Sequence, residues 1–337
     1  MEPLLIRHSF LTTYLAIDRP YWLAWAQLPG VGPITIHRLH EYFGDLASAW
    51  YAPPAELLQV PGLGEITTEK ICAARLSIEP EEFLEKHLRH NPQFWTPADP
   101  EYPQLLLETP TAPAVLYYRG QVDLAENLGN CLTIGIVGTR QPSSYGHKWT
   151  QKVSVALAEQ GFSIISGLAQ GVDTAAHQGC LAVGGRTVAV VGTGLDLVYP
   201  AQNQALAEKI WANGLMVSEY PAGTKPDRGH FPARNRIIAG LSRAVLVMEA
   251  PHKSGALITA YLANDFCRDV FVLPGGLDSP QSAGCLGLIG RGAQMITSID
   301  QLLEMLRAIA PLNLADSSIN QSPTLSSQQT SLPLFTP

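Results

Sequence analysis

The fold of this chain depends most on the stretch from Leu132 to Ala250. It opens as LTIGIVGTRQPSSYG, passes through SIISGLAQGVDTAAHQG and TVAVVGTGLDLVYP, and closes as HFPARNRIIAGLSRAVLVMEA. Its short apolar runs lack strict alternation, which is typical of strands buried on both faces of a parallel sheet. A glycine-bearing loop and a helical segment follow each run. The expected strands are Thr133–Val137, Ser163–Ile165, Thr187–Val191 and Ala244–Met248.

The loops after these strands are the expected working surface, because ligands of parallel sheets bind outside the carboxyl ends of the strands. The first loop, GTRQPSSYG, enters a helix that Ser143 or Ser144 can cap. A helix start beside an arginine, here Arg140, is a natural site for a phosphate. The second loop, SGLAQG, enters a helix for which we predict Asp173 as the cap.

The segment KPDRGHFPARNR, residues 225–236, carries the most specific chemical signal. It combines three arginines, a lysine, a histidine and Phe231 within twelve residues. Arginines that hold phosphates next to a ring that stacks on a base suit single-stranded nucleic acid. The alternative places Phe231 in the core and makes Arg234 or Arg236 internal ion-pair partners. Structure is the favoured role for Arg236, and a loop hydrogen bond is favoured for His230.

Other nucleotide chemistries have little support in this sequence. The pattern GxGxxG does not follow the first strand, and no acidic residue lies where it would hold a ribose. The Walker pattern GxxxxGK[ST] is also missing. A nicotinamide or ATP role therefore has little support, and we expect no cofactor.

Composition and charge set the remaining bounds. The 337 residues are 46% hydrophobic, and no apolar run is long enough to span a membrane. We expect a cytoplasmic protein, because the start of the chain lacks a signal pattern. The five cysteines have no metal-ligand spacing, so we expect small buried residues and no metal ion. Of the net charge of −7, residues 1–130 contribute −8 and residues 131–300 contribute +2, so local cationic loops remain possible.

An internal repeat occupies residues 20–75. The copy LAWAQLPGVGPITIHRL is echoed by LLQVPGLGEITTEKI, with Gly30 and Gly62 thirty-two positions apart. Each copy reads as helix, Pro-Gly-x-Gly hairpin and helix, which resembles the helix-hairpin-helix unit. Because Glu65 follows the second hairpin and acids exceed bases here, a structural or protein-contact role is favoured over DNA contact.

The chain divides into four expected segments: a helix-hairpin-helix (SAM-like) domain at 1–80, a connector at 81–130, a Rossmann-like domain at 131–309 and a disordered tail at 310–337. The connector is rich in proline and contains an expected edge strand, Val115–Tyr118. The tail is rich in Ser, Gln and Pro. Its end resembles the short peptides by which bacterial DNA-processing proteins dock on the sliding clamp, with Gln329, Leu332, Leu334 and Phe335 as the motif.

Taken together, the motifs IVGTRQPSSYG, ISGLAQGVDTAAH, VGTGLDLVYPAQN, RGHFPARNRIIAG, SGALITA and LPGG closely resemble the DprA (Smf) family of DNA-processing proteins. The resemblance runs from about Leu23 to Leu306. It implies an extended Rossmann-like α/β domain with a mainly parallel sheet, preceded by a small all-α domain. It also implies that a homodimer binds and protects single-stranded DNA and loads the RecA recombinase in natural transformation, without catalysing a reaction.

The resemblance also assigns residue roles. Arg140 corresponds to the family's phosphate contact, Phe231 to the stacking ring, and Ser254 to the SG-x-LIT segment. Three departures stand out: Gln170 and Leu286 replace a basic residue and an asparagine, and a polar tail stands where many members carry a winged helix. The predicted DNA-binding residues are Gly138, Arg140, Ser166, Gly167, Gly194, Arg228, Gly229, Phe231, Arg234, Asn235, Lys253, Ser254, Gly255 and Thr259.

Two alternatives belong to other classes of protein. The first is a nucleotide N-glycosidase of the lysine-decarboxylase-like (LOG) type, which shares the sheet architecture. Its PGGxGTxxE motif is incomplete here, since the chain reads PGGLDSP from Pro274, although Glu219 and Glu249 stand at strand ends. The second is an adaptor that joins recombinase and clamp without binding DNA.

Overall fold

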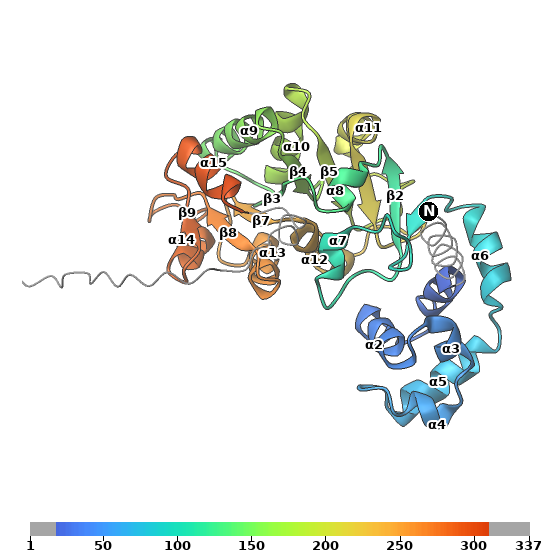
Figure 1. Ribbon diagram of the computed structural model, residues 1–337. Helices are drawn as coiled ribbons and strands as arrows, with labels where there is room; N and C mark the ends of the chain where they lie inside the picture. The colour runs from blue at the N-terminus through green and yellow to red at the C-terminus, as the bar shows by residue number, and fades with distance from the viewer. Residues whose placement is uncertain (1–17, 310–337) are drawn as a thin grey trace, which may run out of the picture.

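The structure is a computed structural model that describes residues 18–309. The predicted clamp motif at residues 329–335 therefore lies outside the described residues. Within them, one nine-stranded sheet is flanked by helices on both faces, and a group of helices lies beside one end of the sheet (Figure 1). The predicted α/β class with a mainly parallel sheet is confirmed.

The sheet has the strand order β1-β2-β6-β5-β4-β3-β7-β8-β9. All neighbours from β6 to β9 pair in parallel, while β2 pairs antiparallel with both β1 and β6. The strands are β1 (Phe94–Trp95), β2 (Leu116–Gly120), β3 (Thr133–Val137), β4 (Ser163–Ser166), β5 (Thr187–Val191), β6 (Leu215–Ser218), β7 (Ala244–Val247), β8 (Asp269–Val272) and β9 (Gln294–Met295).

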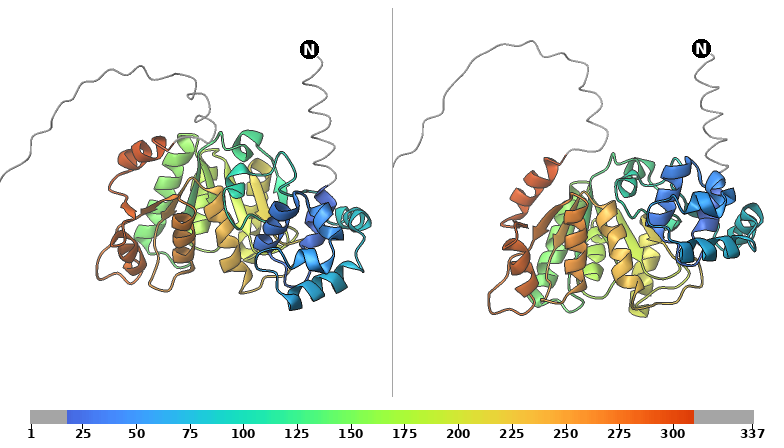
Figure 2. Two further views of the ribbon diagram at one scale, coloured as in Figure 1. Left: turned by 60° about the horizontal axis from the view of Figure 1, so that its bottom comes forward. Right: turned by 90° about the horizontal axis from the view of Figure 1, so that it is seen from below.

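Helices cover both faces because the central strands are apolar on both sides. In β3, Ile134 and Ile136 pack toward one face, while Val137 packs toward the other. Figure 2 shows the two helical layers from other directions. One layer comprises α9 (Ser144–Glu159), α10 (Val172–Ala182), α11 (Gln204–Asn213) and α15 (Ile299–Arg307); the other comprises α7 (Gln104–Leu107), α12 (His230–Leu241), α13 (Gly255–Asp265) and α14 (Ala283–Ile289).

The helices before the sheet have a core of their own, built around Trp22, Trp25 and Trp50. Both repeat hairpins turn at a glycine with positive φ, 76° at Gly30 and 87° at Gly62, where glycine is favoured. The helical segments are residues 18–25, α2 (Pro33–Phe43), α3 (Leu46–Tyr51), α4 (Pro54–Leu57), α5 (Glu65–Arg75) and α6 (Pro80–Leu88). The domain boundaries given above stay a prediction.

The predicted edge position of the strand at Val115–Tyr118 is wrong. Strand β2 lies between β1 and β6, and the short β1 forms the edge instead. The reason is that two residues, Phe94 and Trp95, form a strand too short to leave a pattern in the sequence. The Trp95 ring stacks on Tyr118 with centroids 3.9 Å apart, which anchors the edge.

The expectation of uniformly buried cysteines also needs correction. Cys180 and Cys285 are buried, but Cys267 is exposed and the other two are partly exposed; all five are free thiols. Between residues 18 and 309, no cluster of side chains could hold a metal ion. In the same range, no helix combines the length and apolarity needed to cross a membrane.

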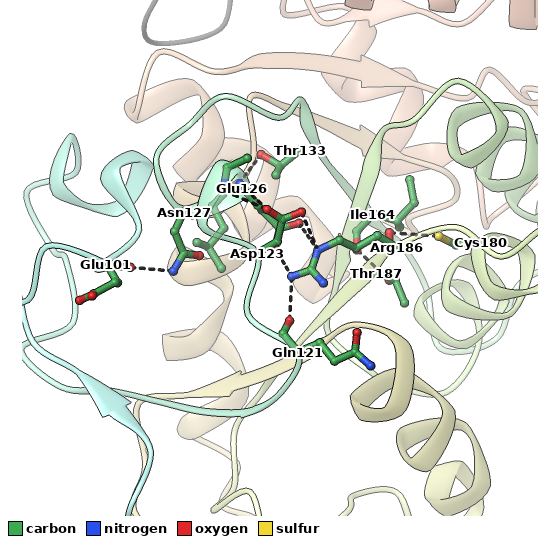
Figure 3. A network of polar contacts seen from close by, with 12 residues as sticks. Glu101, Gln121, Asp123, Glu126, Asn127, Thr133, Ile164, Cys180, Arg186 and Thr187 are labelled. Atoms are coloured by element: carbon green, nitrogen blue, oxygen red, sulfur yellow. Dashed lines mark hydrogen bonds and ion pairs between the residues drawn. The ribbon is translucent and has the colours of Figure 1, made fainter.

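A polar network fastens the connector to the amino edge of the sheet (Figure 3). The Arg186 guanidinium, just before β5, donates to Glu126 at 3.1 and 2.7 Å and to the Gln121 carbonyl at 3.0 Å. Glu126 belongs to the short helix α8 (Leu124–Asn127), which Asp123 caps. The Glu126 side chain is 7% exposed, so this ion pair is largely removed from water.

We predict that Arg186→Met lowers the free energy of unfolding by about 3 kcal/mol, because it leaves the buried Glu126 carboxylate unpaired. The measurement is urea denaturation. The matched control is Lys86→Ala, which breaks an ion pair with Glu82 whose side chains are 68% and 69% exposed and should cost less than about 0.5 kcal/mol. Equal midpoints for the two variants would contradict this role of Arg186.

Candidate nucleic-acid interface

A cavity of about 790 Å³ opens at the carboxyl edge of the sheet. The loops after β3, β4 and β7 and the first turns of α12 and α13 form its walls. A smaller lobe of about 60 Å³ adjoins it and adds Gly167 and Pro200. The lining residues of the main cavity are Val137, Gly138, Thr139, Arg140, Gln141, Ala169, Gln170, Asp173, Tyr199, Arg228, Phe231, Pro232, Arg234, Asn235, Pro251, Ser254, Gly255, Ala256 and Thr259.

The β3 loop is held close to the start of α10, which places Arg140 at the mouth of the cavity. Val172 N donates to the Thr139 carbonyl at 3.2 Å, and Thr139 N donates to the Glu249 carbonyl at 2.7 Å. Gly171 makes this approach possible. Its φ is 87°, and a Cβ there would lie 2.5 Å from the Thr139 oxygen, which no larger residue tolerates.

Helix α12 presents three cavity residues on one face. It begins at His230, so Phe231, Arg234 and Asn235 have the i, i+3, i+4 spacing that aligns side chains on a helix. The helix begins well before its apolar segment at residues 237–239. The earlier start of the helix is what brings the ring, the guanidinium and the amide to a common wall.

Phe231 is partly exposed and lines the cavity, so its alternative placement in the core is wrong. The Tyr199 ring lies beside it, with centroids 5.4 Å apart and planes inclined by 31°. The exposed Arg140 places its guanidinium carbon 5.5 Å from the centre of the Phe231 ring. A cation and two rings therefore meet at one place, which can hold a phosphate and a stacked base.

Arg234, three residues after Phe231 on α12, forms a buried ion pair. Its side chain and that of Asp173 are each 7% exposed, with 3.6 Å between nitrogen and oxygen. Burial lowers the pKa of Arg234 and raises the pKa of Asp173, while each charge opposes the shift of the other. The Arg234 guanidinium also donates to the Gly167 carbonyl at 2.9 Å, so it can position the β4 loop as well as face a ligand.

The predicted cap at Asp173 is therefore wrong. The residue before α10 is Gly171, and Asp173 lies inside the first turn. Its carboxylate accepts from Ala169 N at 3.3 Å and pairs with Arg234 from across the cavity. The sequence pattern of an acid at a helix start did not distinguish capping from this tertiary ion pair.

The third wall comes from the start of α13. The Ser254 side chain caps that helix by accepting from Ala256 N at 3.3 Å. The Asn235 amide donates to the Gly255 carbonyl at 3.2 Å, which joins α12 to α13. Thr259 lies one turn deeper and is buried. This wall offers hydroxyl groups and backbone N–H groups at a helix start, which suit an anion.

The structure brings most of the predicted site residues together. Nine line the main cavity, namely Gly138, Arg140, Arg228, Phe231, Arg234, Asn235, Ser254, Gly255 and Thr259, and Gly167 lines the adjoining lobe. The other four do not line either cavity. Ser166 is buried and donates to the Ile136 carbonyl, and Gly194 packs against Pro221 and Ala222. Gly229 and Lys253 precede their helices outside the lining.

Sequence reasoning missed Tyr199 and the position of Asp173 in the cavity wall. Tyr199 is 45% exposed and lines both cavities. It follows the glycine loop after β5, so its place near a carboxyl strand end was an available signal. Its proximity to Phe231, which follows a different strand, comes only from tertiary packing.

The two acids considered for an enzyme are engaged elsewhere. Glu219 forms an ion pair with Arg236, which agrees with the structural role favoured for that arginine. Glu249 accepts from Ser143 N at 2.7 Å and from its hydroxyl at 2.6 Å, which fixes the start of α9. His230 has a hydrogen-bonding role as expected, but as the first residue of α12 and not in a loop, with its Nδ1 3.1 Å from the Gly192 carbonyl oxygen.

The fold and the cavity define a Rossmann-like α/β protein with a cationic, ring-bearing crevice at the carboxyl edge of its sheet. Residues 93–307 match the model of a protein family described as DNA recombination-mediator protein A. The chain belongs to this family, which confirms the resemblance to DprA (Smf) proteins.

Relatives and solved structures agree with this assignment. The chain is 56% identical to protein Smf of Synechocystis sp., over 88% of this chain and 74% of that protein. It is 36% identical to the DNA processing protein DprA of Bacillus subtilis, over 81% and 94%. The X-ray structure of DprA from Streptococcus pneumoniae superposes with a TM-score of 0.74 at 36% identity, covering 85% of this chain and 97% of that one.

A second solved structure concerns the DprA of Helicobacter pylori and is described in terms of its single-stranded DNA binding mode. It matches with a TM-score of 0.58 at 33% identity, and covers 64% of this chain and 96% of that one. At 33% sequence identity, the two proteins share more than the fold.

The buried His177 of α10 generates a prediction about pH. Burial lowers its pKa to about 3, with a smaller effect of the Arg234 charge. Its Nδ1 lies 2.7 Å from the Thr187 hydroxyl. Between pH 6.5 and 3 the unfolded chain therefore binds more protons at this residue than the folded one, so stability falls as the pH drops below that upper value.

We predict that His177→Asn, which keeps a donor toward Thr187, reduces the slope of unfolding free energy against pH by about 1.4 kcal/mol per unit between about pH 6 and 4. The control is His147→Asn on the exposed side of α9, which should retain the wild-type slope. The measurement is urea denaturation at a series of pH values. An unchanged slope for His177→Asn would show that this histidine is not held neutral.

Proposed function

We propose that this protein binds single-stranded DNA in the cavity at the carboxyl edge of its sheet. The observation that carries the proposal is the meeting of Arg140 and Phe231 in one partly exposed place, with Tyr199 beside them. The arginine can neutralise a phosphate, and the rings can stack on a base. The described binding mode of the Helicobacter pylori relative supports the proposal.

The charge of the cavity fits a polyanion although the chain is acidic. Arg140, Arg228 and Arg234 are among its lining residues, against the single carboxylate of Asp173. Because Asp173 and Arg234 neutralise each other, two exposed arginines set the local field. Phosphate contacts carry no sequence information, so binding should tolerate any sequence and weaken with salt.

The proposed role is non-enzymatic. The glycosidase alternative needs a general acid or base, and the two candidates, Glu219 and Glu249, are bound to Arg236 and Ser143. The adaptor alternative needs no cationic cavity, so it leaves the convergence of Arg140, Arg228 and Phe231 unexplained. Incubation with nucleoside monophosphates, followed for free base, tests the enzyme directly.

We further propose that the strand-bound protein is a homodimer that protects incoming DNA and delivers it to the RecA recombinase during transformation or recombination. Membership of the family supports this role. A dimer would place two cavities on one strand, and linked sites raise the affinity of a single modest site. Sliding-clamp binding through the tail belongs to the same proposal.

Substitution of the two central residues tests strand binding. We predict that Arg140→Ala and Phe231→Ala each weaken binding of a short oligothymidine about tenfold, because one removes a phosphate contact and the other a stacking ring. Arg140→Ala should also reduce the slope of log affinity against log salt by about 0.7. The measurement is a salt-titrated binding curve by fluorescence anisotropy.

The matched control for Arg140 is Lys209→Ala, which removes an exposed cation from α11 and should leave affinity and salt slope unchanged. All variants should unfold at the wild-type urea midpoint. If both cavity variants bind with wild-type affinity, the strand does not bind in this cavity. If the protein prefers duplex to single-stranded DNA, the proposed function is wrong.

Truncation tests the clamp motif. We predict that a chain ending at Ser327 loses binding to the sliding clamp, because it lacks Leu332, Leu334 and Phe335 as apolar anchors. Affinity for oligothymidine serves as the internal control and should not change. If the full chain itself fails to bind the clamp in surface plasmon resonance, the motif has no such function.

A further inference from the structure

A second cavity, of about 230 Å³, lies at the same edge of the sheet, on the side of β2. The segment between α6 and β1, strand β2, and the loops after β5 and β6 form it. Its lining residues are His90, Asn91, Pro92, Gln93, Tyr117, Tyr118, Arg119, Leu195, Asp196, Tyr220 and Ala222. None of them is among the residues that line the first cavity.

Two tyrosines that line this cavity each stack on another aromatic ring. Tyr118 stacks on Trp95 with centroids 3.9 Å apart and planes 18° apart. Tyr220 stacks on His230, also at 3.9 Å, with planes 22° apart. Each stack fixes its tyrosine ring in place, and both tyrosines remain partly exposed. Fixed, partly exposed rings are the platforms on which unpaired bases stack.

The rings connect the two cavities. Tyr220 contacts His230, which is the first residue of α12 and precedes Phe231 in the first cavity. The loop after β5 also serves both, because Leu195 and Asp196 line the second cavity and Tyr199 lines the first. The two cavities therefore share the loop after β5 and are joined by the contact between Tyr220 and His230.

The second cavity combines one cation, Arg119, and the amide of Asn91 with one carboxylate, Asp196. Arg119 is exposed, with its guanidinium carbon 3.8 Å from the Trp211 ring centre and one N–H donating to the Leu195 carbonyl at 3.3 Å. Asn91 accepts from Ala222 N at 2.7 Å, which leaves its amide NH₂ group as a donor. The carboxylate of Asp196 accepts from Gly223 N at 2.9 and 3.0 Å.

We propose that this second cavity is a further subsite for single-stranded DNA, in which a base stacks on Tyr118 or Tyr220 and Arg119 contacts a phosphate. The inference rests on the proposed function, because it assigns the continuation of the same strand. It adds that the strand runs from Phe231 toward β2 and the connector. In this proposal the antiparallel strand β2 contacts the DNA through Tyr118 and Arg119, in addition to extending the sheet.

The test compares oligothymidines of increasing length. Tyr220→Leu retains an apolar side chain and removes the stacking ring, so it should bind the shortest oligomers that fill the first cavity as tightly as wild type. Longer oligomers gain affinity when they reach the second cavity, and the variant should lose that gain, on the order of tenfold. Tyr118→Leu should show the same dependence on length, and Tyr220→Phe should restore wild-type behaviour.

The control is Tyr42→Leu, which changes an exposed tyrosine on α2 and should have no effect at any length. Wild-type affinity of Tyr220→Leu at every length would overturn the subsite. An equal loss at every length would also overturn it, because it would mean that the change acts on Phe231. If wild type binds no oligomer, the proposed function itself fails, so the two failures are distinguishable.

Discussion

The buried ion pair between Arg234 and Asp173 is the contact on which the site depends. It joins α12 to α10 across the carboxyl edge of the sheet, and its guanidinium also holds the Gly167 carbonyl. A Cβ at Gly167 would displace the Arg234 guanidinium, so the glycine lets the arginine keep this position. An ion pair out of water is costly to break, so the loops around it keep one arrangement.

The position of this pair explains how an acidic chain can offer a cationic crevice. Asp173 is neutralised by Arg234 within the cavity wall, while Arg140 and Arg228 remain exposed. The excess of acidic residues falls instead in residues 1–130. The field at a binding site depends on nearby charges, so the net charge of −7 is a poor guide to partners.

The two edges of the sheet differ in their contacts and in their exposure to solvent. At the amino edge, Arg186 and Glu126 fasten the connector through a pair with little exposure to solvent. At the carboxyl edge, the loops stay open and carry partly exposed rings such as Phe231, Tyr199 and Tyr220. The connector thus reaches both edges of the sheet. Its strand β2 lines the second cavity, and its Glu126 forms the ion pair that stabilises the amino edge.

Patterns in the sequence were enough to predict the parallel strands, the edge of the sheet at which the first cavity opens and most residues that line it, because buried strands and glycine loops are local features. It could not decide that β2 is internal, that Asp173 pairs with Arg234, or that Tyr199 and Tyr220 join the rings of α12. These facts depend on which segments meet across the sheet. Such contacts follow from packing the whole chain and leave no mark at a fixed spacing in the sequence.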